Sequence, residues 1–418
     1  MKNTPNKDIN SVKEKTLAHN LCINCGICKF VCPYGAISLK RNSYKELIPV
    51  VDEKKCKNCG MCTKYCPHTK EKMLKECENL QQVQFPEKRG LEDSYNYYLA
   101  WNPNDKERIK SASGGIITKL ALSLLEDKKI DGVIHAQRLY AKYGEVHFAG
   151  ALSKTAQEIL DRASSIYAPI RFDEILLQLE ENKTYLFCGT PCIIRAVKNL
   201  FEKHPKFKNI KILTCALICS HIVNEQYSDW LADCNKISKN IEYKVNFRNK
   251  DGLDDINNFN THFYSKDRDI LKKNRNYTGF TESWRNYYFA MYSCLYCSDI
   301  WGYTADISVK DAWDKYSTDN LGRSLVVIRD NDLNNYFRTM QIKTEPVSAQ
   351  DVLENELPSA IFKQKEAYNK MFLPLFSKAN RKNGLLKRKI TSKLSKVLYK
   401  YLGFKITKLI LRRIDKKL

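Results

Sequence analysis

The cysteines are the residues of this chain most able to do chemistry, and their spacing is regular. There are 16 cysteines in 418 residues. The first residues are polar and contain no apolar signal segment, so we expect the chain to remain in the cytosol. Because cytosolic thiols are kept reduced, these cysteines are expected to ligate metal rather than to form disulfides. Eight cysteines form two runs of identical spacing, each followed by proline: Cys22, Cys25, Cys28 and Cys32 before Pro33, and Cys56, Cys59, Cys62 and Cys66 before Pro67.

The second run repeats the first 34 residues later, which indicates an internal duplication. Its spacing is typical of a bacterial-type ferredoxin domain with two 4Fe-4S clusters, in which the fourth cysteine of each run ligates the other cluster. We therefore expect one cluster on Cys22, Cys25, Cys28 and Cys66, and a second on Cys56, Cys59, Cys62 and Cys32. Residues 35–39 and 47–52 can supply the short strands of such a domain. A pair of zinc knuckles is the alternative, but it does not normally pack four cysteines this closely before a proline.

The rest of the chain alternates strand and helix patterns, which predicts an α/β body. The expected helices cover residues 116–125 and 193–202, and the expected strands cover 130–136, 184–187 and 210–219. Cys192 and Cys219 follow two of these strands, at the edge where open α/β sheets bind ligands. With Cys294 and Cys297 they complete four thiolates, which suits a third 4Fe-4S cluster. Zinc in the same four positions remains an alternative, because both metals accept four thiolates.

Residues 111–115 read Ser-Ala-Ser-Gly-Gly and lead into the first expected helix. Backbone N–H groups in such a segment can bind a phosphate. The two glycines by themselves favour an ordinary helix cap at Ser113.

The order of motifs resembles the beta subunit family of coenzyme F-420 hydrogenases and dehydrogenases, in the version with an N-terminal two-cluster ferredoxin. The similarity runs from about residue 22 to about residue 333. It rests on Ser113-Gly-Gly115 with Thr118, Ser165 and Tyr167, Gly189-Thr-Pro-Cys192, Cys219, Phe247-Arg-Asn-Lys250 with Gly252, Cys294 with Cys297, Ala305-Asp-Ile307, and Asp311 with Trp313.

The resemblance implies FAD beside a 4Fe-4S cluster, and electron transfer between a hydride carrier and one-electron centres. It implies that four residues approach the flavin pyrophosphate rather than form only a helix cap: Ser113, Gly114, Gly115 and Thr118. It also implies that Cys192, Cys219, Cys294 and Cys297 ligate the inner cluster. Arg248 and Lys250 would lie near the flavin or the substrate; a solvated basic strand end is the alternative.

Two departures from the family pattern affect the substrate side. Ile166 stands where relatives usually have a basic residue, and Ser220-His221-Ile222 stands where they usually have His-Gly after the cysteine. Use of the deazaflavin coenzyme is therefore not implied. The catalytic residue is unknown from sequence; His221, Tyr167 and Lys310 are proton-donor candidates by location.

The net charge of +23 is concentrated at the C-terminus. Residues 378–418 hold fifteen Lys or Arg and one acid, which gives +14. Apolar residues recur there at helical spacing, with an interruption near Gly403. Such a basic amphipathic helix binds anionic membrane surfaces, or packs on the body with its charges solvated. No apolar run is long enough to span a membrane, so we expect a cytoplasmic protein, peripheral at the membrane if the tail binds lipid.

We thus expect a ferredoxin domain (1–80), the two parts of a flavin-binding body (81–170 and 171–345) and a basic helical extension (346–418). The expected function is an iron–sulfur flavoprotein oxidoreductase. Its flavin exchanges hydride with an organic substrate or a deazaflavin-like coenzyme, and polysaccharide metabolism of the cell envelope is one setting that the resemblance suggests. One alternative is the electron-transfer beta subunit of a hydrogenase or formate dehydrogenase complex, which implies a redox partner protein. Another is a zinc-stabilised nucleic-acid-binding protein; on the redox reading no nucleic acid is expected.

Overall fold

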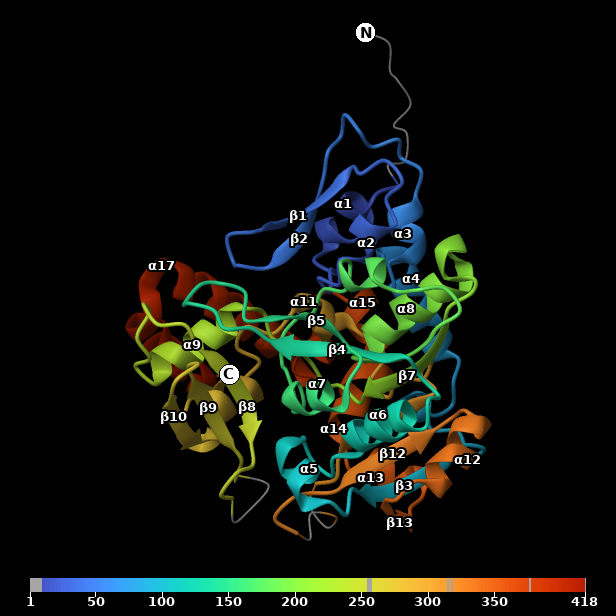
Figure 1. Cartoon of the computed structure of the whole chain (residues 1–418). Helices are drawn as coiled ribbons and strands as arrows, with labels where there is room; N and C mark the ends of the chain where they lie inside the picture. Colours follow the sequence, from blue (N-terminus) through green and yellow to red (C-terminus); the bar gives the residue numbers. More distant parts are fainter. Residues whose placement is uncertain (1–9, 254–257, 314–315, 317–318, 376, 418) are drawn as a thin grey trace.

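The computed structural model describes residues 10–253, 258–313, 316, 319–375 and 377–417. The body of the protein is built around an eight-stranded sheet, with a smaller three-stranded sheet beside it. An N-terminal module lies on this body (Figure 1). Helices from the C-terminal part pack against both the module and the body. The mixed α/β architecture with a C-terminal helix, predicted from the sequence, is confirmed.

The N-terminal module combines short helices with one antiparallel hairpin. The hairpin pairs Ile37 with Val51, in the two segments where the sequence predicts strands. The module is held to the body by an ion pair between Lys29 and Asp173 at 2.7 Å, and by the Tyr65 hydroxyl, which donates to the carbonyl of Lys203 at 3.2 Å. Its elements are α1 (Val12–Lys15), α2 (Ile27–Phe30), β1 (Ile37–Arg41), β2 (Leu47–Val51), α3 (Met61–Tyr65) and α4 (Lys70–Gln81).

The large sheet has the strand order β13-β3-β12-β11-β7-β6-β4-β5. Its four central strands, β4, β6, β7 and β11, run parallel, and antiparallel strands complete both edges. The three strands of the body that the sequence predicts are β4, β6 and β7, and they lie in the buried centre of this sheet. The members are β3 (Asn96–Trp101), β4 (Gly132–Arg138), β5 (Phe148–Ser153), β6 (Thr184–Gly189), β7 (Lys211–Leu217), β11 (Ile307–Asp311), β12 (Ser324–Ile328) and β13 (Lys343–Pro346).

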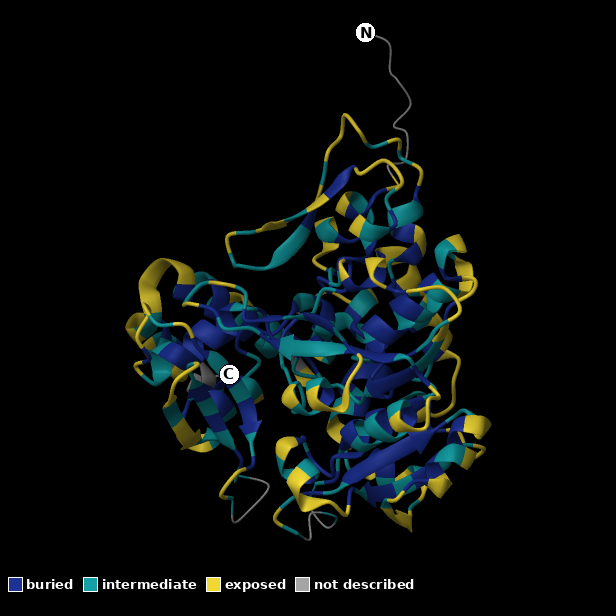
Figure 2. Ribbon diagram, viewed as in Figure 1, coloured by how far each residue is buried: buried dark blue, intermediate teal, exposed yellow. Residues whose placement is uncertain are grey.

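Alternating residues of the central strands pack against helices on both faces of the sheet (Figure 2). In β6, Tyr185 and Phe187 pack in one core with α8 (Pro191–Lys203) and with α2 of the N-terminal module. Leu186 packs on the other face with α6 (Ile116–Glu126) and α12 (Asn331–Thr339). Burying each of these side chains contributes about 1.5–3 kcal/mol. Shorter helices between the strands are α5 (Asp105–Lys110) and α7 (Ala156–Asp161).

The smaller sheet has the antiparallel order β10-β9-β8 and carries an aromatic core. Phe247 and Phe263 of this sheet pack with Tyr227 and Trp230, all buried. This packing places Arg248, near the end of β8, against the large sheet, where it contacts Asp311. The elements are α9 (Gln226–Cys234), β8 (Lys244–Asn249), β9 (Asn260–Tyr264), β10 (Asp269–Asn274), α10 (Phe280–Arg285) and α11 (Tyr292–Tyr296).

The C-terminal part is helical, as the sequence predicts, and it packs closely on the rest of the chain. α15 packs on α4 of the N-terminal module, and α17 packs on α9 and α11. The Ser395 hydroxyl of α17 accepts from the Phe289 N–H at 2.8 Å. At Gly403 α17 is broken by a left-handed residue with φ 68°. Among the described residues no helix combines the length and apolar content that crossing a bilayer requires. The elements are α13 (Ala349–Glu354), α14 (Leu357–Ala360), the π-helical turn η8 (Ile361–Lys365), α15 (Ala367–Phe372), α16 (Lys378–Lys382) and α17 (Leu385–Lys417).

Candidate redox centres and cofactor cavity

Two loops of the N-terminal module repeat the same backbone conformation around their cysteines. Asn24 and Asn58 are left-handed, with φ of 57° and 54°, and so are Gly26 and Gly60, with φ of 79° and 73°. A side chain at position 26 would also meet Asp173, because an added Cβ would lie 2.6 Å from its Oδ1. Glycine permits both the turn and the close approach to the body.

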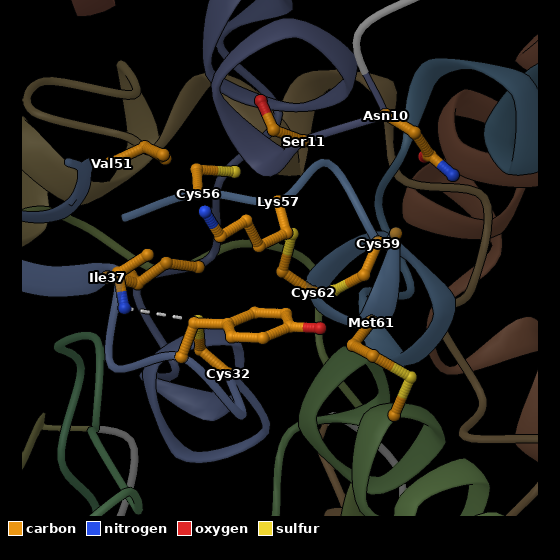
Figure 3. A pocket seen from close by; sticks show the side chains of 13 residues that line it. Asn10, Ser11, Cys32, Ile37, Val51, Cys56, Lys57, Cys59, Met61 and Cys62 are labelled. Atoms are coloured by element: carbon orange, nitrogen blue, oxygen red, sulfur yellow. Dashed lines mark hydrogen bonds between the residues drawn. The ribbon is translucent and has the colours of Figure 1, made fainter. Parts of the chain in front are cut away.

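The distal cluster site consists of the thiols of Cys32, Cys56, Cys59 and Cys62, which line one small pocket (Figure 3). Cys32 comes from the first run and the other three from the second, the exchange expected from the spacing. The Ala36 N–H donates to the Cys32 sulfur at 3.3 Å. Cys59 is exposed, so this site lies at the protein surface.

The proximal cluster site consists of Cys22, Cys25, Cys28 and Cys66. Burial, with a smaller contribution from a Cys66 thiolate nearby, raises the pKa of Cys22 to about 12. The pKa of Cys28 is likewise raised by burial and then by Cys25, Cys22 and Cys66, so the four thiols are close neighbours. The Thr16 hydroxyl lies 3.5 Å from the Cys66 sulfur. Since buried free thiols resist ionisation, these cysteines would become thiolates only with a metal present.

A third group of thiols, the candidate inner cluster site, consists of Cys192, Cys219, Cys294 and Cys297, which come from three separate parts of the fold. Cys192 lies in the first turn of α8, Cys219 follows β7, and Cys294 lies in α11. Burial, with smaller contributions from thiolates at Cys297 and Cys294, raises the pKa of Cys192 to about 12, so the structure brings these sulfurs near one another. Cys25 of the proximal site is also close enough to Cys192 for their charges to interact.

In the described part of the chain, no three or more His, Cys, Asp or Glu side chains are arranged as ligands of one metal ion. A 4Fe-4S cluster attaches its four thiolates to different irons, so its ligands need not converge on one point.

A buried lysine that the sequence patterns did not identify lies against the inner cluster site. Lys363, in the η8 turn, is 2% exposed. Its ammonium donates to the carbonyls of Cys219 at 2.9 Å and Asp299 at 3.1 Å. Burial disfavours its charged form, but thiolates at Cys297, Cys219 and Cys294 raise the pKa of Lys363 overall. Sequence reasoning missed it because it lies in a basic segment without a motif.

A cavity of about 380 Å³ opens beside the inner cluster site, and Cys192 and Cys219 form part of its wall. The carboxyl ends of β6, β7 and β11, the first turn of α6 and residues 162–170 enclose it. This is the edge of a parallel sheet where ligands usually bind. Its volume lies within the range of small-molecule and cofactor sites.

Four of the six residues expected to contact a flavin line this cavity: Ser113, Gly115, Thr118 and Arg248. Gly114 does not line it and instead packs on the sheet, where an added Cβ would lie 2.6 Å from the Ala100 carbonyl oxygen. Lys250 also lies outside the lining. Its ammonium donates to the carbonyls of Ser113 at 2.7 Å and Leu321 at 2.9 Å, so it fixes the loop that leads into α6.

Arg248 presents unpaired donors at the cavity. It is buried and forms an ion pair with Asp311, and its guanidinium lies 4.8 Å from the Phe259 ring centroid and 5.4 Å from that of Trp313. Its Nε and Nη2 have no hydrogen-bond partner among the described residues. Burial alone would raise the pKa of Asp311, but Arg248 lowers it overall, so the pair is ionised. These donors fit a ligand with carbonyl or phosphate oxygens.

The three proton-donor candidates all line the cavity. His221 is stacked between Trp284 and Tyr287, with ring centroids at 4.0 and 4.3 Å, and burial lowers its pKa to about 3, so the ring is neutral at pH 7. Burial raises the pKa of Tyr167. Lys310 forms an ion pair with Glu356 at 2.6 Å.

Paired ferredoxin-type loops on an α/β body define the class of the protein: an iron–sulfur oxidoreductase. Residues 21–70 match the 4Fe-4S dicluster domain. Residues 97–176 match the N-terminal part, and residues 182–350 the C-terminal part, of the coenzyme F420 hydrogenase/dehydrogenase beta subunit. The two matches together cover more than half of the chain, and it belongs to this family.

Other comparisons add little to the family assignment. One chain in a solved structure of the F420-reducing NiFe hydrogenase complex from Methanosarcina barkeri is 18% identical over 68% of this chain and 91% of that chain, with a TM-score of 0.46. No curated protein matches the sequence.

Proposed function

We propose that this iron–sulfur oxidoreductase binds two 4Fe-4S clusters in its ferredoxin domain, a third at the inner cluster site and FAD in the cavity. The observation that carries the proposal is the shared wall: Cys192 and Cys219 belong both to the inner cluster site and to the cavity lining. A flavin bound there would lie beside the inner cluster. Residues 1–80 would then form the electron-relay domain, residues 81–345 the catalytic body and residues 346–418 a helical extension.

The positions of the thiols support one order of electron transfer. The distal site is exposed at Cys59, whereas Cys25 of the proximal site neighbours Cys192 of the inner site. Electrons from a one-electron donor would therefore enter at the distal site and reach the cavity through the proximal and inner sites. The reverse direction uses the same path.

The cavity residues fit a flavin dinucleotide. Bound flavin joins hydride transfer to single-electron transfer. The backbone of Gly115 and the first turn of α6 would hold its pyrophosphate, because free N–H groups at a helix N-terminus favour anions. Arg248 would orient the ligand through its unpaired Nε and Nη2. The stacked rings of His221 and Trp284 exclude water from one side.

The hydride acceptor or donor would be an organic substrate or a deazaflavin-like coenzyme, and envelope polysaccharide metabolism is one setting for it. The second candidate is an electron-transfer beta subunit of a hydrogenase or formate dehydrogenase complex. The exposed edge at Cys59 favours this second candidate, because a partner's redox centre could approach there.

Anaerobic purification with iron, zinc and flavin analysis tests the proposal. We expect about twelve irons per chain, four for each cluster, together with one FAD. About eight irons per chain would refute the third cluster, and a protein without flavin would refute the proposed hydride chemistry. Zinc without iron would refute the redox function as a whole.

We also propose that the C-terminal helix contacts an anionic membrane surface. Four large apolar residues around the break in α17 are exposed on the described surface: Tyr401, Leu402, Ile406 and Leu409. Lys400 and Lys405 lie among them and are exposed too. Each lysine near anionic lipid contributes about 1 kcal/mol to binding. The other face of α17 packs on the body, so this exposed patch is the surface that would meet lipid.

Vesicle flotation tests the membrane contact. The wild type is expected to float with vesicles containing phosphatidylglycerol and not with pure phosphatidylcholine. Replacing both Leu402 and Ile406 by Ser should abolish flotation, whereas Leu177→Ser, at an exposed leucine elsewhere, should not change it. Equal flotation of all three proteins would refute membrane binding through this patch.

A further inference from the structure

The inner cluster site has a buried positive charge beside it that comes from the C-terminal extension. Lys363 lies beyond residue 350, where the match to the family ends. Its ammonium is fixed by two carbonyls, one of which belongs to the cluster residue Cys219. The turn that carries it is π-helical, a rare geometry that often occurs at functional sites.

Lys363 has no carboxylate partner within the described part of the chain. Two other buried lysines do have one: Lys310 pairs with Glu356 at 2.6 Å and Lys396 with Glu46 at 3.1 Å. Lys250 and Lys370, like Lys363, donate to backbone carbonyls instead. Asp299 lies next to Lys363, but it offers its backbone carbonyl. Its carboxylate accepts from the Gly302 N–H at 2.8 Å through Oδ1, and Oδ2 has no partner among the described residues. A buried ammonium without a counter-ion is costly. The four inner thiolates are the negative charges that can compensate it.

Other positive groups near this site are partly offset or weakly charged. The charge of Arg195 interacts with both Cys66 and Cys297. Arg195 pairs with Glu76 at 2.5 Å, a carboxylate that Arg89 also contacts at 3.5 Å. Lys370 is buried too, but burial lowers its pKa to about 7. Lys363 is the ammonium that contacts the inner site directly, through the carbonyl of Cys219.

We propose that Lys363 is the counter-ion that sets the reduction potential of the inner cluster. This inference rests on the proposed third cluster. One-electron reduction adds one negative charge to the group bound by the four thiolates, and the ammonium stabilises that added charge while keeping its own proton. A higher potential at the inner site draws electrons from the proximal site toward the cavity. Lys363 is thus a positioning and tuning residue and does not touch substrate.

A redox titration followed by EPR, on the full chain with its clusters, tests this role. Lys363→Met removes the charge and keeps most of the side-chain volume. We expect it to make reduction of the inner cluster at least tenfold less favourable, which corresponds to about 59 mV for one electron. Lys363→Arg should keep the potential close to that of the wild type. Lys365→Met is the matched control, because this exposed lysine lies in the same turn and its charge is screened by water.

Each outcome separates the inference from the proposed function. Loss of four irons in Lys363→Met but not in Lys363→Arg would also support the counter-ion role, because retention of the inner cluster would then depend on the positive charge and not on the shape of the side chain. An unchanged potential in Lys363→Met, or loss of iron in both variants, would overturn it. A wild type with about eight irons would instead refute the third cluster itself, before any variant is compared.

Discussion

The ion pair between Arg248 and Asp311 closes one wall of the cavity, and Asp311→Asn tests what it contributes. Arg248 is 3% exposed, and this is its one ion pair among the described residues. Removing one partner of a buried pair costs about 3–5 kcal/mol, since the other charge is left uncompensated. Asparagine keeps a hydrogen-bond acceptor at the same place, so we expect about 3 kcal/mol, the lower end of that range.

Urea unfolding followed by tryptophan fluorescence measures this loss, because Trp313 lies beside Arg248. The double variant Arg248→Met with Asp311→Asn is expected to recover part of it, since no buried charge then remains unpaired. Glu180→Gln, in an exposed pair with Lys154, is the control and should leave the urea midpoint close to that of the wild type. A loss below about 1 kcal/mol for Asp311→Asn would refute the argument from burial.

The pH dependence of the same variant follows from the direction of the pKa shift. Arg248 holds the pKa of Asp311 below its usual value although burial opposes this. A carboxyl group with a lowered folded pKa stabilises the protein fully above its unfolded pKa, about 3.9, and the stabilisation is lost as the pH falls through the folded pKa. The difference between wild type and Asp311→Asn should therefore be constant from pH 8 to pH 5. A difference that shrinks within this range would contradict the assignment.

Three further predictions test the cluster sites and the packing. Cys66→Ser should lose the proximal cluster and stop electron transfer to the inner site, whereas Cys32→Ser should lose the distal cluster and leave the proximal EPR signal intact. Gly302→Ala should cost about 1–3 kcal/mol in urea unfolding, because the added methyl would lie 2.5 Å from Cβ of Ala216 at a residue with φ 65°; an unchanged midpoint would contradict this. Tyr399→Phe should cost about 1–3 kcal/mol, because it removes a buried hydroxyl that hydrogen-bonds both Tyr143 and the carboxylate of Asp233, and limited proteolysis should then release α17 sooner than in wild type.

The ferredoxin module was predictable in detail because its determinants are local in sequence. Each cysteine run, with its asparagine and glycine, forms one tight loop, and the apolar segments between them form the hairpin β1–β2. The buried parallel strands β4, β6 and β7 were predictable for a similar reason, since a short unbroken apolar run is compatible with few structures other than a strand buried on both faces. The antiparallel strands at the edges of the sheet carry weaker patterns, and partners far along the chain hold them in place.

The cofactor cavity shows the limit of such reasoning. The segment around Ser113 lies partly in the cavity wall, yet the sequence did not distinguish Gly115, which lines the cavity, from Gly114, which packs on β3. Lys250 was expected near the ligand because it follows Arg248 in the same motif. Its side chain points to backbone carbonyls instead, because β8 ends at Asn249 and the alternation that would place residues 248 and 250 on one face ends with the strand.

The sequence by itself determined the chemistry of this protein: the cysteine types and spacing, the order of motifs and the charge of the tail. The tertiary structure decided which groups meet. It joined Cys192, Cys219, Cys294 and Cys297 from distant segments, set the proximal site beside them, and brought Lys363 of the extension against the same thiols. The physical reason is that ligand spacing within one loop is encoded by neighbouring residues, whereas the position of a buried charge depends on packing among elements hundreds of residues apart.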